Sequence, residues 1–324
     1  MKKHLEEIDI LRGIAIVMVI LYHSIIVFPI DLLEIVWCKT LHDFLWLMEM
    51  PLFFIVSGFC FSYKGNYKQY IWKKVKRILI PHFVFCAIDL LPRIIPNNLV
   101  HEKTTLQEGL KNLLLYGGTD WFLWTLFLVV AIFPFLHWFM EKGIGEKIMV
   151  SLLVLLAYVF REHVTQLFLL ATLTRFLIYY LIGYFISKLD YEKMKEYVGN
   201  GITAMIALFL LAGSFYAVEQ HQLPFEVLLA ISGAIVCYYI ALHLTGFSQK
   251  FLVECGGYSL QMFLLDGYAL VLTRTIIVKV LQIQQPLIII VCNFILDLLI
   301  VLIITKYFFT KWKILRVLSG LPDK

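Results

Sequence analysis

The sequence predicts an all-α, polytopic membrane protein, a transmembrane bundle of about ten helices with both termini in the cytoplasm. Of its 324 residues, 61% are hydrophobic and 16% are charged, whereas ordinary soluble domains contain about 45–50% and about 25%. A water-soluble chain of this length cannot bury so much apolar surface. The composition therefore excludes a soluble enzyme, a disordered protein and a nucleic-acid-binding module.

Apolar segments of spanning length recur along the whole chain. A helix of about 20 apolar residues crosses the hydrocarbon because it satisfies its own backbone N–H and C=O groups. The fifth segment is short, and polar residues interrupt the ninth. We expect a single membrane domain over residues 1–324 with no appended soluble domain. The ten predicted segments are 13–30, 43–63, 78–95, 119–139, 148–160, 167–187, 201–218, 225–245, 257–277 and 287–308.

The distribution of basic residues predicts the orientation. With the N-terminus inside, most of the 28 lysines and arginines fall in segments that face the cytoplasm, where such residues are enriched. An even number of helices also returns the C-terminal basic cluster to that side. We therefore expect a multi-pass protein of the cell membrane, in contact with membrane lipids. Homo-oligomerisation remains open.

The six cysteines are scattered along the chain. They include no CxxC pair, and no histidine stands at metal-ligand spacing from them. The sequence therefore predicts neither a disulfide framework nor a metal site.

The first segment, EEIDILRGIAIVMVILYHS, carries three polar residues on one stripe: Asp9, Arg12 and His23. Eleven helical steps from Arg12 to His23 end about 20° short of whole turns and place His23 about 16 Å deeper, near mid-membrane. An ionisable group at that depth faces protein or water. His23 is a candidate general base, because histidine exchanges protons near neutral pH. The alternatives are a structural histidine and, for Arg12, a membrane anchor.

The second segment, FLWLMEMPLFFIVSGFCFSY, contains Glu49 beside Pro51. A carboxyl group cannot face lipid cheaply, so we expect Glu49 to face the same cavity as His23. Ser57 and Gly58 permit close helix packing and are also candidates for a binding role.

Six lysines and arginines lie between positions 64 and 77, just before the third segment. Such a cluster binds anionic lipid headgroups or, equally, the phosphates of a nucleotide-like donor. Arg77 is the best candidate for phosphate because its guanidinium forms a fork, with Lys74 and Lys76 beside it.

Three further polar or aromatic residues are candidates for substrate contact. Trp121 lies at an outer interface, where aromatic belts are common. Arg175 and Asp266 lie deeper and could contact a polar substrate. Asp266 could instead pair with a buried base such as Arg274.

Several motifs resemble the acyltransferase 3 family of integral membrane acyltransferases. They are DILRGIAIVMVILYH, MPLFFIVSGF and KRILIP in this order, followed by the weaker matches WFLWTLF and YSLQMFLL. The resemblance implies transfer of an acyl group, usually acetyl, from cytoplasmic acyl-CoA to a hydroxyl of a sugar or other envelope-associated acceptor, with no metal.

The resemblance also assigns residues. Arg12 and His23 match the essential pair of the first helix, and Arg77 matches the basic residue at the start of the third. Asp9, Ser57 and Gly58 match motif positions whose roles are less defined. Two positions depart from the pattern: Glu49 and Asp266 stand where members often carry histidine, which suggests a different acceptor.

The sequence leaves two functions in competition. The first is a membrane O-acyltransferase in which arginines hold the phosphates of acetyl-CoA or another acyl-CoA and His23 acts on the acceptor, an envelope glycan or other hydroxyl compound. The second is a transporter or flippase for a polyol or lipid-linked sugar. The weakness of any internal repeat counts against the second.

Overall fold

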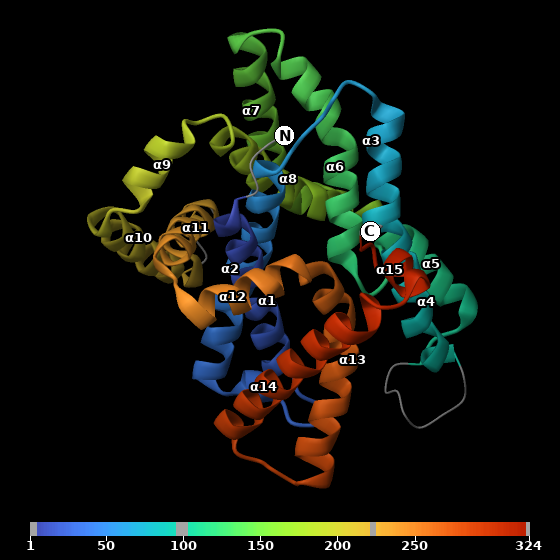
Figure 1. Cartoon of the computed structure of the whole chain (residues 1–324). Helices are drawn as coiled ribbons and strands as arrows, with labels where there is room; N and C mark the ends of the chain where they lie inside the picture. Colours follow the sequence, from blue (N-terminus) through green and yellow to red (C-terminus); the bar gives the residue numbers. More distant parts are fainter. Residues whose placement is uncertain (1–4, 95–102, 221–224, 322–324) are drawn as a thin grey trace. The chain divides into compact units, whose positions relative to one another are not determined.

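The computed structural model describes residues 5–94, 103–220 and 225–321, and these residues form helices and no strands (Figure 1). Within them, seven helical segments are long and apolar enough to cross a membrane, so the chain is a multi-pass membrane protein. Each overlaps one of the ten predicted segments. They are Glu6–Ile25, Val36–Phe59, Leu106–Met140, Leu167–Ile186, Gly201–Glu219, Phe225–His243 and Pro286–Phe309.

The other three predicted segments are helical but shorter. They correspond to α4 (Ile80–Ile94), α7 (Ile144–Val159) and α13 (Ser259–Arg274), with 15, 16 and 16 residues. Sixteen residues rise only about 24 Å, less than the hydrocarbon thickness of about 30 Å. A π-helix, η2 (Val75–Leu79), runs directly into α4, and another, η5 (Thr275–Val280), directly follows α13. Whether these three segments cross the membrane stays a prediction.

The chain forms two compact units, each assembled from two stretches of sequence. The first consists of Met1–Phe59 and Gly183–Phe309, and the second of Cys60–Ile182 and Thr310–Lys324. Helices of the first unit are α1 (Glu6–Ile25), η1 (Leu32–Glu34), α2 (Val36–Phe59), the end of α8 (Leu170–Ile186), α9 (Tyr191–Val198), α10 (Gly201–Glu219), α11 (Phe225–His243), α12 (Gly246–Gly257), α13, η5, α14 (Pro286–Ile304) and η6 (Thr305–Phe309). Those of the second are α3 (Tyr67–Lys74), η2, α4, α5 (Leu106–Tyr116), α6 (Trp121–Met140), α7, η3 (Arg161–His163), η4 (Leu167–Leu169), most of α8 and α15 (Lys313–Leu318).

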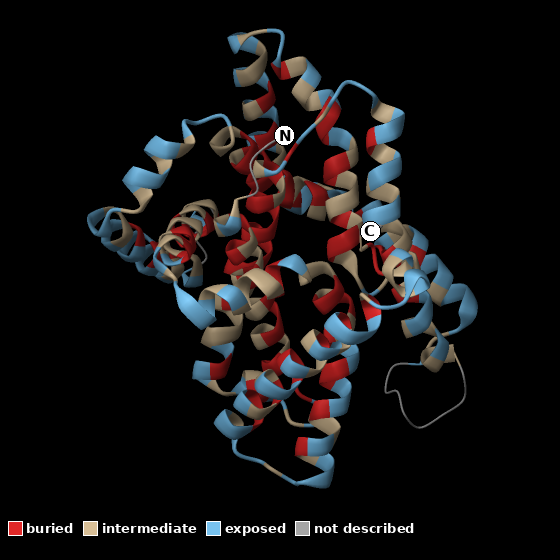
Figure 2. Ribbon diagram, viewed as in Figure 1, coloured by how far each residue is buried: buried red, intermediate tan, exposed pale blue. Residues whose placement is uncertain are grey.

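Helix α1 forms the centre of the first unit. It packs against α2, α11, α12, α13 and α14, and its residues Ala15, Ile16, Val19 and Ile20 are fully buried. Figure 2 shows buried residues along α1 and α2 and mostly exposed ones along α10, whose apolar side chains suit contact with lipid.

Aromatic packing forms the core of the second unit. The ring of Phe133 on α6 lies 4.9 Å from that of Phe61 and 4.6 Å from that of Tyr180, measured between centroids. The Tyr67 hydroxyl donates a hydrogen bond to the carbonyl of Ala131, which joins α3 to α6.

Two glycines allow α1 and α12 to approach closely at the start of α1. A Cβ atom added to Gly13 would lie 2.1 Å from the carbonyl oxygen of Leu252, and one added to Gly256 would lie 1.8 Å from that of Asp9. Both obstacles are backbone atoms, which cannot move aside like a flexible side chain. The contact therefore requires glycine and fixes α12 beside Asp9 and Arg12.

Substitution of Gly256 with alanine is expected to destabilise the protein by about 1–3 kcal/mol, because the added methyl group overlaps the backbone of α1. The measurement is the midpoint of thermal unfolding of the purified protein, followed by size-exclusion chromatography after heating. The neighbouring Gly257→Ala is the matched control, because nothing lies within 4 Å of a Cβ at that position. Equal midpoints for the two variants would contradict the close contact.

Candidate active site

Asp9 and Arg12 lie together in the first turns of α1. Arg12 Nη1 donates to Asp9 Oδ1 at 3.0 Å, one helical turn away. Glu6, Glu7 and Asp9 place negative charge in the first turn, where it complements the helix dipole. Asp9 thereby orients the Arg12 guanidinium at this end of α1.

His23 lies in the last turn of α1, which ends at Ile25. The predicted helix over 13–30, with His23 near mid-membrane, was therefore wrong in its bounds. The physical reason lies after the helix: Pro29 disfavours helical backbone at Phe28, and Ile26 is already extended. His23 is thus near the end of the helix opposite to Arg12, about 16 Å away along the axis.

The imidazole of His23 pairs with a buried carboxyl group. His23 Nδ1 bonds to Oδ2 of Asp266 on α13, so Asp266 pairs with His23 and not with Arg274. The Asp266 side chain is 1% exposed, whereas that of His23 is 32% exposed. Because the carboxylate accepts the Nδ1 proton, Nε2 becomes the nitrogen that can take a proton from another molecule.

Two more carboxyl groups surround this pair. Glu49 on α2 is 0% exposed and interacts electrostatically with His23 and Asp266. Both its carboxyl oxygens lack a hydrogen-bond partner among the described residues. Asp297 on α14 is buried and lies next to Asp266. Residues from α1, α2, α13 and α14 therefore converge on one polar group, which we call the His23 cluster: His23, Glu49, Asp266 and Asp297.

Aromatic rings lie beside His23, whose ring centroid is 5.2 Å from that of Tyr22. Tyr22 is stacked on His42 with ring centroids 4.4 Å apart, and its ring lies 5.7 Å from that of Trp46. Asp43 accepts a hydrogen bond from His42 at 2.9 Å. Tyr22, His42 and Trp46 thus form one aromatic group of α1 and α2 beside His23.

The predicted phosphate-binding residues lie in the second unit, around the π-helix η2. Lys74 lies over the ring of Tyr70 at 5.4 Å and Lys76 over that of Trp72 at 5.5 Å. Arg77 is exposed. π-Helical turns are rare and are frequent at functional sites, so this turn presents the basic side chains in an unusual register.

The chain matches one protein family over most of its length. The family model of acyltransferase 3, described as an acyltransferase domain, matches residues 5–306. The chain belongs to the acyltransferase 3 family. Comparisons with curated proteins and with solved structures found no significant match. Family membership supports acyltransferase activity and leaves the donor and acceptor to be inferred from the site.

The acyltransferase 3 resemblance predicted histidine where this chain has Asp266. The structure shows what this aspartate contacts. An aspartate at this place on α13 provides His23 with a carboxylate partner from another helix. Glu49, the second departure, lies in the same cluster. Both unusual residues therefore surround the family's first-helix histidine.

The remaining predicted residues of this acyltransferase 3 chain fall outside the His23 cluster. In the first unit, Ser57 and Gly58 lie near the end of α2, where a Cβ at Gly183 would meet Ile55 O at 1.9 Å. This part of α2 is thus a helix-packing surface. In the second unit, Trp121 stacks on Phe176 at 5.4 Å, and the Arg175 guanidinium lies 6.0 Å from the same ring. Trp121 and Arg175 therefore lie beside the same ring, that of Phe176.

Asp297 was missed at the sequence level, although an acid inside the very apolar segment 287–308 is itself a signal. Asn293, one turn before it, is also fully buried, and its amide has no hydrogen-bond partner among the described residues. The two share one face of α14. A polar stripe of this kind marks the side of the helix that faces protein.

Proposed function

We propose that this protein is a membrane-embedded O-acyltransferase that moves an acetyl or other short acyl group from cytoplasmic acyl-CoA to a hydroxyl of a cell-envelope sugar, polysaccharide or related acceptor. The pairing of His23 with Asp266 is the observation that carries the proposal, because it gives a partly exposed imidazole a fixed orientation and a buried counter-charge. Such a pair is the general base of many acyl-transfer enzymes.

The reaction needs one proton acceptor at the attacking oxygen. His23 Nε2 takes the proton of the acceptor hydroxyl while the oxygen attacks the thioester carbonyl. A C–O bond forms, the C–S bond breaks, and the leaving CoA thiolate takes the proton from His23. Asp266 holds the imidazole through Nδ1 and stabilises the imidazolium that forms, so it acts as a positioning residue. In the second form of the mechanism, His23 carries the acyl group itself between donor and acceptor.

The donor is assigned to the basic residues. In the first unit the candidate for the phosphates of acyl-CoA is Arg12, ordered by Asp9; in the second unit the candidates are Arg77, Lys74 and Lys76. In the proposed topology of ten crossings with both termini inside, these residues lie at the cytoplasmic face, where acyl-CoA is found. The protein is then a component of the cytoplasmic membrane.

The acceptor is assigned to the His23 cluster and its surroundings. Carboxyl oxygens accept hydrogen bonds, and hydroxyl groups donate them. Glu49, whose oxygens have no partner among the described residues, suits a polyhydroxylated acceptor, and the rings of Tyr22 and Trp46 offer a packing surface. In the second unit, Trp121 and Arg175, which lie beside the ring of Phe176, are separate candidates for contact with an acceptor. The acceptor is therefore a sugar-like molecule.

The proposal is tested by mass spectrometry of envelope glycans from cells with the gene, without it, and with the His23→Ala variant. We expect an acyl group that is present only when the active protein is made. Membranes from the same cells should transfer label from acetyl-CoA to that glycan. Unchanged acyl content, together with movement of an unmodified polyol or lipid-linked sugar across the membrane, would overturn the proposal in favour of transport.

A further inference from the structure

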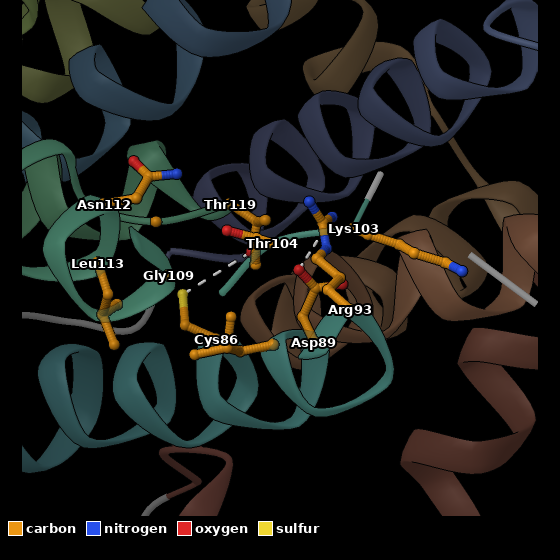
Figure 3. Close-up of a pocket in the computed structure, with 11 residues that line it drawn as sticks. Cys86, Asp89, Arg93, Lys103, Thr104, Gly109, Asn112, Leu113 and Thr119 are labelled. Carbon is orange, nitrogen blue, oxygen red and sulfur yellow. Dashed lines mark hydrogen bonds and ion pairs between the residues drawn. The ribbon is translucent and has the colours of Figure 1, made fainter. Parts of the chain in front are cut away.

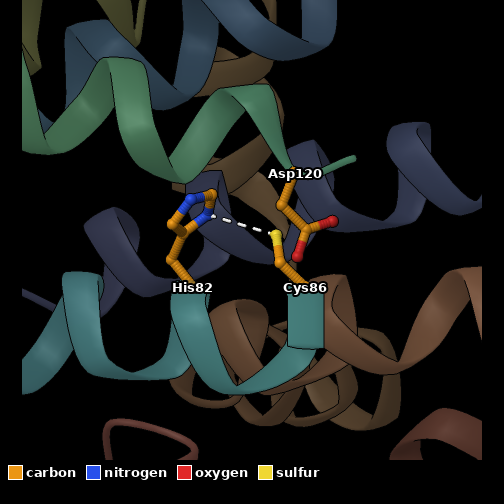
Figure 4. Close-up of side chains that lie close together, drawn as sticks. All are labelled: His82, Cys86 and Asp120. Carbon is orange, nitrogen blue, oxygen red and sulfur yellow. Dashed lines mark hydrogen bonds between the residues drawn. The ribbon is translucent and has the colours of Figure 1, made fainter. Parts of the chain in front are cut away.

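The second unit contains a cluster of metal-ligating side chains that is separate from the proposed acyl-transfer residues. His82 and Cys86 stand one turn apart on α4, and Asp120 precedes α6 (Figure 4). One ligand atom from each of the three residues lies within 4.8 Å of the others. His82 and Cys86 are four residues apart in the sequence. The prediction that no histidine stands at metal-ligand spacing from a cysteine was therefore wrong.

Two of the three side chains are shut off from solvent. His82 is 0% exposed and Cys86 is 5% exposed. Cys86 Sγ lies 3.8 Å from His82 Nδ1, close to the separation of about 3.6 Å between sulfur and nitrogen ligands of a tetrahedral zinc ion. A carboxylate oxygen of Asp120 lies within 4.8 Å of ligand atoms of both residues. These distances fit one small cation.

The Cys86 sulfur and a carboxylate oxygen of Asp120 lie within 4.8 Å of each other, and the Thr119 hydroxyl lies 3.9 Å from the sulfur. A thiolate beside a carboxylate would be repelled in a buried place, unless a cation lies between them. A divalent ion with a neutral imidazole, a thiolate and a carboxylate makes an electrically neutral group.

A cavity of about 500 Å³ opens next to the cluster, and Cys86 and Thr119 belong to its wall (Figure 3). Its other polar residues include Asn112 and the Asp89–Arg93 ion pair of 3.0 Å. Three protein ligands with an open fourth position are characteristic of zinc sites that bind water or a substrate, whereas structural zinc sites have four protein ligands. The cavity provides room for that fourth ligand.

We propose that His82, Cys86 and Asp120 bind a zinc ion whose fourth coordination position faces this cavity and takes water or an oxygen of a bound molecule. Zinc is favoured over magnesium and calcium because thiolate and imidazole are ligands of zinc and not of those harder cations. The ion also ties α4 to the start of α6. This site is independent of the proposed acyl transfer.

Metal content tests the proposal without reference to activity. The full-length protein is purified in detergent without chelator, incubated with zinc sulfate, freed of excess metal and analysed by elemental mass spectrometry. We expect about one zinc per chain in the wild type, and at least about tenfold less in Cys86→Ser and in Asp120→Asn, because each removes one ligand. Cys60→Ser is the matched control, since Cys60 is an exposed cysteine of the same unit and its loss should leave the zinc content unchanged.

Cobalt substitution identifies the ligand directly. Cobalt bound to the wild type should show a thiolate charge-transfer absorption that is lost in Cys86→Ser and kept in Cys60→Ser. Zinc should also raise the thermal midpoint of the wild type and not that of Cys86→Ser, and the same unfolding curves show whether each variant is folded. No bound zinc in the wild type, or equal zinc in wild type and folded Cys86→Ser or Asp120→Asn, would overturn the three-ligand site.

Discussion

Replacement of His23 with alanine is expected to lower acyl transfer by about 10²–10⁴-fold, the usual contribution of a positioned proton acceptor. The imidazole is the group of the His23 cluster that can take the hydroxyl proton, and no carboxyl of the cluster can replace it at the same place. The measurement is the rate of transfer from acetyl-CoA to the acceptor glycan in membranes that contain equal amounts of each protein. A rate equal to that of the wild type would remove His23 from the mechanism.

His243→Ala is the matched control for this substitution. His243 also lies in the last turn of a helix of the first unit, α11, where its Nδ1 hydrogen-bonds to the carbonyl of Tyr239. We expect this variant to keep wild-type activity. Because His23→Ala leaves the carboxyl of Asp266 buried without its partner, a loss of folding could imitate a loss of catalysis. The double variant His23→Ala/Asp266→Asn removes the imidazole and the carboxylate together, and it should be folded and inactive.

Asp266→Asn is expected to give the second-largest effect, a fall in kcat of about 10²–10⁴-fold with little change in KM for acyl-CoA. The amide has nearly the shape of the carboxylate, so the packing of α13 is kept. It cannot stabilise the imidazolium, however, and it can present its N–H₂ group to Nδ1, which would place the imidazole proton on Nε2. The base would then be blocked at the nitrogen that should receive the proton.

The kinetic parameters of Asp266→Asn distinguish this role from a structural one. A positioning residue changes kcat, whereas a general weakening of the first unit changes the amount of folded protein and leaves the kcat of the folded fraction intact. Asp31→Asn is the control, because Asp31 is an exposed aspartate of the same unit that caps the short helix η1, a role that asparagine also fills. Full activity of Asp266→Asn would show that the His23–Asp266 bond does not contribute to catalysis.

The sequence predicted the membrane class and the family well because both depend on local patterns. Runs of apolar residues reveal a spanning helix without knowledge of its neighbours, and seven of them correspond to spanning helices among the described residues. The three motifs within residues 9–81 predicted the family, and the match over residues 5–306 confirmed it. The stripe of Asp9, Arg12 and His23 also follows from helical geometry alone.

The partners of His23 could not be predicted in this way. Asp266 lies 243 positions later in the chain, and its contact depends on how α1 and α13 pack. The sequence suggested Arg274 as a partner for Asp266 and did not indicate His23. The position of His23 in the last turn depended on where the helix ends, which the proline at position 29 determines more strongly than the apolar residues around it.

The close contact between α1 and α12 has a consequence for the donor. Gly13 and Gly256 hold α12 against the start of α1, beside Arg12, while the helix itself separates Arg12 from His23 by about 16 Å along its axis. Helix α1 thus sets the distance between the two side chains. In the proposed mechanism, a donor anchored by its phosphates at Arg12 needs an arm long enough to bring its thioester to His23, so the helix would select acyl carriers by their reach.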